Sequence, residues 1–392
     1  MVGAQAMVNV NQPNELLQEL SLIARELGFV GMGVSSIEPL TQGAEALDSW
    51  LTQEYHGEMT YMGNHPRRDD PTMMLDEAKT LLVVALPYDR EDLTEPTSER
   101  PRGVIARYAR GRDYHEVLRE KLLELADRLT ALLERPVISR PCVDTAPLLE
   151  REYAARAGIG FIAKNTMLIM PSAGSYVLLG ELLLDIELPP STPISPKCGQ
   201  CTQCLDRCPT RAFVGPHILD ARKCISYFTI ELKGPIPREF RKSIGDHVFG
   251  CDICQEVCPF NTSSKPRPGA PSLAPHSKQV SPDLVDLLTL TSGDYRRLVK
   301  NTAMRRTTRP QLMRNAAVAL GNSGMSSVVP ALTQALESNP YPLARGHIAW
   351  ALGQLPSSES KQALEKALPI ETDTWVREEI ETALSDLEHT DG

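Results

Sequence analysis

Several features that define common protein classes are absent from this chain of 392 residues. Its first residues, MVGAQAMVNVNQPNELL, lack the basic segment followed by an apolar segment that marks an export signal. The longest apolar runs, residues 81–86 and 177–184, are too short or too interrupted to span a bilayer. We therefore expect a cytoplasmic protein with no membrane-spanning segment.

Motifs of several enzyme classes are missing as well. The chain has no glycine fingerprint for a dinucleotide, no Walker loop and no H-E-x-x-H zinc signature. Acidic residues are missing from residues 295–336, although the net charge of the whole chain is −9. In an acidic protein such a basic stretch is a candidate phosphate-binding surface, and the alternative is an ordinary solvated face. The basic residues of the stretch are Arg296, Arg297, Lys300, Arg305, Arg306, Arg309 and Arg314.

Eight of the nine cysteines lie between positions 198 and 258. The first four follow the ferredoxin pattern C-x2-C-x2-C-x3-C-P, in which the fourth cysteine ligates the other cluster. The second run ends in the same way, but Val248 stands where its first cysteine is expected, and Cys224 is the replacement. Eight thiolates suit two 4Fe–4S clusters. The predicted sets are Cys198, Cys201, Cys204 and Cys258 for cluster 1, and Cys208, Cys224, Cys251 and Cys254 for cluster 2.

Three alternative roles suit these cysteines less well. Disulfide frameworks belong to small secreted domains. Two structural zinc sites would use paired C-x2-C knuckles, without the triplet or the two Cys-Pro endings. Buried unliganded cysteines would not cluster at such spacings. The ninth cysteine, Cys142, has no obvious histidine partner nearby and is interpreted as a small buried residue.

Apolar periodicity divides the rest of the chain. Residues 1–190 alternate amphipathic helices with buried strands, which indicates an α/β domain. Helices are expected over residues 14–28, 113–134 and 146–157. Strands are expected over residues 29–35, 80–86, 137–142 and 175–188, the last as one strand or as two that are divided at Gly180. Proline-rich linkers at residues 189–196 and 263–277 flank the cysteine-rich segment.

The C-terminal part of the sequence repeats itself. Ala319-Leu320-Gly321 recurs as Ala351-Leu352-Gly353, and again as Ala383-Leu384, so that each step, from 319 to 351 and from 351 to 383, is 32 residues. This period indicates a small α-solenoid of paired helices that resembles HEAT-type repeats, a kind of surface that binds macromolecules. The alternative is a plain helical bundle.

Asp144 is the candidate for acid–base chemistry. It follows a predicted strand and precedes a predicted helix, a position where α/β folds collect reactive groups. In a partly apolar cavity its pKa would be raised, so that it could donate a proton near neutrality. The alternative is that Asp144 caps the following helix. His115 is expected to begin a helix, and the turn at Lys164-Asn165-Thr166 either contacts a large cofactor or shapes a loop.

Six stretches together resemble the epoxyqueuosine reductase family, which makes the queuosine base of tRNA. They are YARGRDYH (108–115), VDTAP (143–147), AGIGFIAKNT (157–166), CISYFTIE (224–231), GCDICQEVCP (250–259) and LMRNAAVALGN (312–322). The resemblance implies a nitroreductase-like, cobalamin-binding α/β domain over residues 1–190. It also implies a ferredoxin-like domain with two 4Fe–4S clusters over residues 191–265, and a HEAT-like, tRNA-binding domain over residues 280–392.

The resemblance also assigns residues to roles, with Asp144 as the proton donor. The implied cobalamin contacts are Arg67, Arg107, Asp144, Lys164, Asn165, Thr166, Met167, Leu168, Ser226, Cys251 and Asp252. The expected nucleic-acid contacts are Lys233, Arg296, Arg297, Arg305, Arg306, Arg309 and Arg314.

The implied reaction is the reduction of epoxyqueuosine to queuosine at the wobble position of tRNA. Electrons from an external donor of ferredoxin or flavodoxin type pass through both clusters to cobalamin, with cluster 2 as the nearer one. Asp144 protonates the departing oxygen, which leaves as water. We expect a monomer. The alternatives are a cytoplasmic corrinoid reductase of a small molecule, similar to reductive dehalogenases, and a non-catalytic electron carrier.

Overall fold

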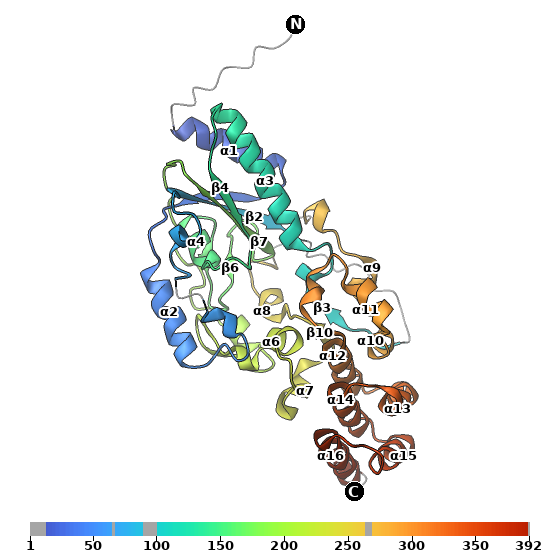
Figure 1. Cartoon of the computed structure of the whole chain (residues 1–392). Helices are drawn as coiled ribbons and strands as arrows, with labels where there is room; N and C mark the ends of the chain where they lie inside the picture. The colour runs from blue at the N-terminus through green and yellow to red at the C-terminus, as the bar shows by residue number, and fades with distance from the viewer. Residues whose placement is uncertain (1–12, 65–66, 89–99, 263–268, 391–392) are drawn as a thin grey trace.

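The computed structural model describes residues 13–64, 67–88, 100–262 and 269–390. Figure 1 shows the sheet and its helices at one end, the stacked C-terminal helices at the other end, and the cysteine-rich segment between them. Within the described residues, no helix is long and apolar enough to cross a membrane.

The N-terminal part is built on a four-stranded sheet in the order β1-β2-β7-β4. Its strands are β1 Gly31–Ser35, β2 Thr80–Pro87, β7 Val177–Leu184 and β4 Ser139–Cys142. Every pairing in this sheet is antiparallel. Helices and strands alternate along the sequence as predicted, but they do not build the parallel sheet that usually accompanies such alternation.

Helices cover both faces of this sheet. Along β2, Leu82, Val84 and Leu86 pack toward α1 Pro13–Glu26 and α3 Tyr114–Leu133, and the intervening residues pack toward α4 Glu150–Arg156. Burial on two faces explains why β2 is a continuous apolar run. The sheet and its helices form three layers (Figure 1).

Of the one or two strands expected around Gly180, the structure has one, because β7 runs through Gly180 without interruption. A Cβ atom on Gly180 would lie 3.2 Å from Leu122 and 3.4 Å from Leu118, both on α3. The glycine therefore allows close packing between a strand and a helix.

The ends of two predicted helices are also informative. Helix α3 begins after Asp113, whose side chain accepts a hydrogen bond from the backbone N–H of His115, and ends at Glu134 in the left-handed region. Helix α4 begins only at Glu150, later than predicted. Residues 146–149, expected to be helical, form a bent loop instead, and Asp144, just before them, has a φ of 42°.

The cysteine-rich segment contains short helices that are linked to the N-terminal part. They are α5 Gln203–Asp206, α6 Ile225–Ile230, α7 Arg238–Ile244 and α8 Ile253–Glu256. Strand β10 His247–Phe249 pairs with β3 Val104–Ile105. The linker at residues 189–196 packs against the sheet, since the backbone N–H of Val34 donates to the Ser191 hydroxyl over 2.9 Å. The predicted linker at 263–277 lies partly outside the described residues.

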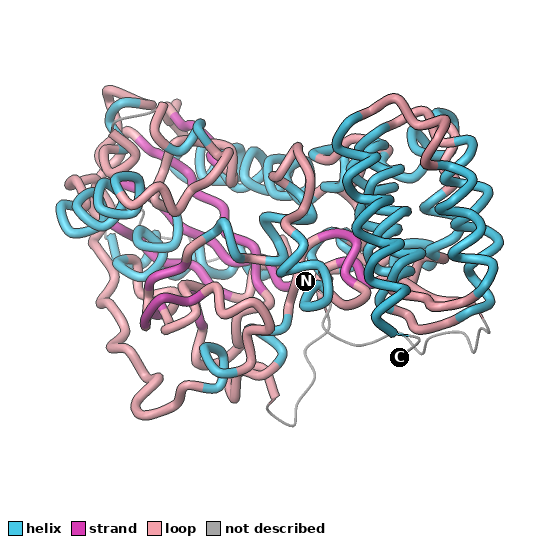
Figure 2. The backbone as a smooth tube through the Cα atoms, turned by 90° about the horizontal axis from the view of Figure 1, so that it is seen from below, coloured by secondary structure: helices cyan, strands magenta, loops and turns pink. Residues whose placement is uncertain are grey.

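The C-terminal helices stack as the period predicts (Figure 2). After α10 Leu284–Leu288, α11 Ser292–Val299 and the short helix η6 Ala303–Arg306, one row contains α12 Arg309–Asn322, α14 Pro342–Gly353 and α16 Thr374–Thr390, and the other contains α13 Val329–Ser338 and α15 Ser358–Ala367. A Cβ atom on Gly321 would lie 2.8 Å from the Ala351 Cα, and one on Gly353 would lie 2.9 Å from the Ala383 Cβ. The repeated glycine therefore marks close contact between successive helices of the first row.

Helix α12 joins the repeats to the cysteine-rich segment through buried polar side chains. Arg314 is fully buried and donates to the backbone carbonyls of Phe228, Leu232 and Gly234. Gln311, Asn315 and Asn322 likewise donate only to backbone carbonyls of this segment. The expectation that Arg314 contacts nucleic acid is wrong, because its guanidinium is enclosed by protein.

Replacing Arg314 should destabilise the junction. Arg314→Leu would remove the donor to the carbonyls of Phe228 and Gly234, while the Leu232 carbonyl would keep Gln311 as a donor. We expect a loss of about 3 kcal/mol in the free energy of unfolding. Arg297→Leu is the matched control, because Arg297 is exposed and pairs with Asp294 of its own helix, and exposed pairs contribute about 0–1 kcal/mol. Chemical denaturation of both variants measures the difference, and equal losses would contradict the prediction.

Candidate active site

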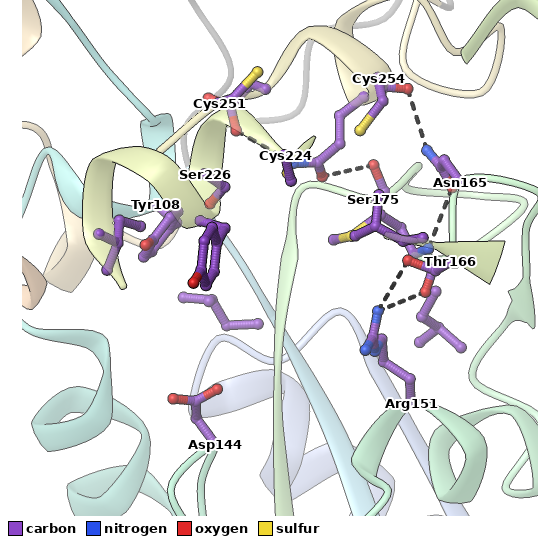
Figure 3. Close-up of a pocket in the computed structure, with 18 of the residues that line it drawn as sticks. Tyr108, Asp144, Arg151, Asn165, Thr166, Ser175, Cys224, Ser226, Cys251 and Cys254 are labelled. Carbon is purple, nitrogen blue, oxygen red and sulfur yellow. Dashed lines mark hydrogen bonds between the residues drawn. The ribbon is translucent and has the colours of Figure 1, made fainter. Parts of the chain in front are cut away.

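A cavity of about 490 Å³ lies where the sheet, the cysteine-rich segment and η6 meet. Apolar and aromatic side chains make up most of its lining, including Met59, Tyr88, Tyr108, Met167, Leu168, Val177, Leu178 and Leu179. A few polar side chains point into it, among them Asn165, Ser175 and Ser226 (Figure 3). This combination is typical of a site that binds an organic cofactor or substrate.

Asp144 lies on the loop between β4 and α4, on the opposite side of the cavity from Cys224, Cys251 and Cys254 (Figure 3). The residue that precedes α4 is Leu149, and no side chain caps that helix. The interpretation of Asp144 as a helix cap is therefore wrong. Its left-handed backbone conformation, which is uncommon for a residue other than glycine, presents the carboxylate to the cavity.

A histidine joins Asp144 to a second carboxylate. The Nε2 atom of His115 lies 3.0 Å from Oδ2 of Asp144, and its Nδ1 atom lies 2.7 Å from Oδ1 of Asp113. Asp113, His115 and Asp144 thus form a row, and two arginines of η6 pair with the carboxylates at its two ends. Nε of Arg305 lies 3.1 Å from Oδ2 of Asp113, and Nη1 of Arg306 lies 3.5 Å from Oδ2 of Asp144.

This row sets the protonation of its members. Burial alone would lower the pKa of His115, but its two carboxylate partners raise that pKa to about 9, so the imidazole is protonated at neutral pH. Burial pushes the pKa of Asp144 upward, yet His115 and Arg306 bring it below its ordinary value. The expectation of a raised pKa for Asp144 is therefore wrong, because its cationic neighbours were not recognised in the sequence.

Two more carboxyl groups lie behind Asp144. Glu150 lines the cavity, and its Oε2 atom accepts a hydrogen bond from the backbone N–H of Asp144 over 3.3 Å. Burial and then the charge of Asp144 raise the pKa of Glu150. Burial and then Glu150 raise the pKa of Glu181, which is 1% exposed on β7. Near neutral pH, Asp144 is therefore ionised and Glu181 is protonated, while Glu150, whose pKa is raised to about 7, lies between the two states.

The thiols of the cysteine-rich segment fall into two groups in space. The pKa of Cys254 is raised by burial, then by the nearby Cys224, Cys251 and, more weakly, Cys208. In the other group, burial raises the pKa of Cys258, and Cys198 and Cys201 raise it further; Cys204 is influenced by Cys258 and Cys198. The two groups have the same members as the two predicted ligand sets, and their ligation of clusters stays a prediction. Among the described residues no three ligands converge on a single metal ion, and a four-iron cluster needs more widely spaced thiolates.

Comparisons with known proteins agree with this arrangement. Three family models match: "Epoxyqueuosine reductase QueG, DUF1730" over residues 68–145, "4Fe-4S double cluster binding domain" over residues 197–261, and "HEAT repeats" over residues 301–385. An epoxyqueuosine reductase of Xanthomonas campestris pv. campestris is 39% identical, covering 87% of this chain and 97% of the relative. One of Escherichia coli K12 is 37% identical, covering 91% and 94%. This chain belongs to the epoxyqueuosine reductase family.

Solved structures of epoxyqueuosine reductases share the fold. One, in complex with a tRNA-Tyr epoxyqueuosine-modified stem loop, has a TM-score of 0.90 and 35% identity, covering 96% of this chain and 100% of that chain. The Bacillus subtilis enzyme, with its Asp catalytic loop swung out of the active site, has a TM-score of 0.89 and 34% identity over the same shares. Epoxyqueuosine reductases are oxidoreductases whose cofactors are cobalamin and two 4Fe–4S clusters.

Most of the expected cobalamin contacts line the cavity. They are Asp144, Asn165, Thr166, Met167, Leu168, Ser226, Cys251 and Asp252. Three others do not line it, because their side chains have other partners. Arg67 pairs with Asp70, and Arg107 pairs with Asp252 and Glu256. Lys164 donates to the backbone carbonyls of Gly199 and Cys201 over 2.8 and 3.0 Å, in the loop of cluster 1.

The basic stretch has a divided role. Lys233, Arg296 and Arg297 are exposed on the surface. Arg305 and Arg306 instead pair with the carboxylates of the site, and Arg306 also lies 3.2 Å from Glu231. The guanidinium of Arg309 donates hydrogen bonds to the hydroxyl groups of Ser292 and Tyr341. The basic residues of this stretch are therefore divided between the exposed surface, ion pairs at the site and contacts within the repeats, and their binding of nucleic acid stays a prediction.

Sequence reasoning missed the role of His115. Its expected position at the beginning of a helix is correct, but that position also directs its ring toward Asp144. The only local signal was the spacing of Asp113 and His115, two residues apart at a helix start. The contact with Asp144, 29 residues further along, left no periodic trace.

Loss of one cluster ligand should remove one cluster selectively. In Cys224→Ser, cluster 2 lacks a thiolate, and we expect about half of the iron content of the anaerobically reconstituted protein, since each cluster uses its own four ligands. Iron analysis and electron paramagnetic resonance of the reduced protein measure this. Cys142→Ala is the control: burial raises the pKa of this thiol to about 12, and its loss should leave the iron content unchanged. Equal iron contents in the two variants would contradict the assignment.

Proposed function

We propose that this protein reduces epoxyqueuosine to queuosine at the wobble position of tRNA, with cobalamin held in the cavity. The observation that carries the proposal is the position of Asp144 across one cavity from Cys224, Cys251 and Cys254. A cofactor bound in this cavity would lie between the cysteines proposed to ligate cluster 2, which would supply electrons, and Asp144, which would supply a proton. The curated relatives of this chain carry the same activity in their names.

The lining of the cavity fits cobalamin. A corrin is a broad, largely apolar ring with amide side arms, and the apolar lining offers it contact area while Asn165, Thr166 and Ser226 offer amide and hydroxyl groups. When bound, cobalamin supplies the low-valent cobalt that delivers electrons to the epoxide. The chain itself orients the substrate, excludes water and handles protons.

Asp144 is the residue proposed to protonate the epoxide oxygen. Opening of the ring leaves charge on that oxygen, and an acid within hydrogen-bond reach stabilises it. Arg306 lies beside the Asp144 carboxylate and faces the same cavity. Its positive charge also stabilises negative charge that develops there. The overall change consumes two electrons and two protons: both C–O bonds break, a C=C bond forms and the oxygen leaves as water.

Electrons are proposed to enter at cluster 1 and to leave from cluster 2. Three of the four cluster 2 cysteines line the cavity, whereas none of the cluster 1 cysteines does. A low-potential donor of ferredoxin or flavodoxin type would therefore dock near Cys198 and Cys201, which are partly exposed. We propose that the protein acts as a monomer in the cytoplasm.

The exposed basic residues are proposed to hold the tRNA backbone. An unstacked base of the anticodon loop can be splayed into a pocket, while phosphates are bound by basic side chains outside it. Lys233, Arg296 and Arg297 are exposed members of the predicted set that do not pair with carboxylates of the site. Arg305 and Arg306 are exposed too, but they pair with Asp113 and Asp144.

Removal of the Asp144 carboxylate should stop the reaction without loss of cofactors. In Asp144→Ala we expect single-turnover product formation to fall at least 100-fold, since general acids typically contribute about 10²–10⁴-fold. Iron content and the visible spectrum of bound cobalamin should not change. Asp127→Asn, at an exposed position on α3, is the control. Normal turnover by Asp144→Ala would disprove the assigned role.

Reversal of the exposed charges should weaken tRNA binding. We expect the double variant Lys233→Glu/Arg296→Glu to bind tRNA at least 10-fold more weakly and with a shallower dependence of log K on log salt, because fewer phosphates are neutralised. Lys366→Glu is the control, because Lys366 lies on α15 and pairs with Glu337. Filter binding at several salt concentrations measures both slopes. An unchanged slope would make this surface an ordinary solvated face.

A further inference from the structure

The proposed reaction needs two protons, and Asp144 does not hold one in the resting site. Its carboxylate is flanked by the protonated ring of His115 and by the guanidinium of Arg306. Such cations favour the ionised form of a carboxyl group. The proton that reaches the substrate through Asp144 must therefore come from a neighbour.

We propose that His115 is the proton source of this site and that Asp144 relays each proton from the imidazolium to the epoxide oxygen. This inference rests on the proposed function. The Nε2–H group of His115 donates to Oδ2 of Asp144, and both side chains line the cavity. The Nε2 proton moves first to the Asp144 carboxylate, which passes it to the epoxide oxygen; the ring of His115 is left neutral and Asp144 is ionised again.

The surroundings of His115 suit a group that gives up and regains a proton. Asp113 is fully buried and holds Nδ1 of the ring, which orients Nε2 toward Asp144. The ring stacks on Tyr114, with centroids 4.0 Å apart. The His115 side chain is 16% exposed, so water can restore its proton. Two passages of the same route therefore deliver both protons.

Within the described part of the chain, charged groups from three elements lie around the ring, and Glu116 and Glu231 pair with two of them, Arg305 and Arg306. Asp113 belongs to the same helix start, Asp144 and Glu150 come from the β4–α4 segment, and Arg305 and Arg306 come from η6. The carboxylates outweigh the arginines, since the pKa of His115 is raised to about 9. His115 thus keeps its proton up to about pH 9 and loses it as the pH rises through that value. His115 acts through Asp144 and is a positioning residue in the reaction.

The test uses the holoenzyme with both clusters and cobalamin, and single-turnover reduction of epoxyqueuosine-modified tRNA from about pH 6 to about pH 10. The wild-type rate should fall above about pH 9. His115→Asn should reduce the rate about 100-fold, with little change in the KM for tRNA. His389→Asn, at an exposed position near the end of α16, is the control and should match the wild type.

Asp113→Asn separates proton supply from simple positioning. Asparagine retains the helix cap and the Oδ1 acceptor but removes the negative charge beside His115. The alkaline limb of the pH profile should move down by about one pH unit. Nuclear magnetic resonance of ring-labelled histidines should show the same shift in the His115 titration, independently of activity.

Two results would overturn the inference. One is a pH limb in Asp113→Asn that stays in place although the His115 ring titrates at lower pH. The other is His115→Asn with the wild-type rate and profile. If the wild type made no queuosine at any pH, the proposed function would fail and this inference with it, whereas either of the first two results would leave the proposed function intact.

Discussion

The attachment of α12 to residues 230–232 of the cysteine-rich segment underlies the whole arrangement. The side-chain amide of Gln311 donates to the backbone carbonyls of Ile230 and Leu232, and its side-chain oxygen accepts from the backbone N–H and the hydroxyl of Thr308, just before α12. Glu231, between those two carbonyls, pairs with Arg306. Buried carbonyl groups require hydrogen-bond donors. Moving the repeats away from the cysteine-rich segment would therefore leave several of these carbonyls unpaired at once.

This attachment explains how a repeat unit comes to contribute to a catalytic site. The short helix η6 comes directly before α12 in the chain. Because the start of α12 is fixed, Arg305 and Arg306 of η6 lie next to α3 and the β4–α4 loop. They meet Asp113 and Asp144 there. The charge of the site is therefore set by three separate parts of the chain, and none of these parts would hold the same protonation state alone.

The sequence was most informative where spacing alone specifies the structure. Cysteine intervals predicted two sets of thiols, which the structure brings together as two groups. A step of 32 residues predicted the stacked helices, because Gly321 and Gly353 recur at equivalent helix contacts. Asp144 was found from its place after a strand, although the sheet is antiparallel. The pKa of Asp144 and the burial of Arg314 could not be predicted, because both depend on partners that are far away in the sequence and leave no periodic pattern.

The turn formed by Lys164 and Asn165 has a consequence for the assembly of the metal centres. Lys164 holds the carbonyls of Gly199 and Cys201, and Asn165 donates to the carbonyl of Cys254 over 3.1 Å. Two adjacent residues outside the cysteine-rich segment thus fasten one loop of each cluster. Much of the conformational entropy of these loops is lost when the polypeptide folds. Iron and sulfide therefore bind to loops that are already ordered, and less of the binding free energy is offset by the cost of ordering the protein.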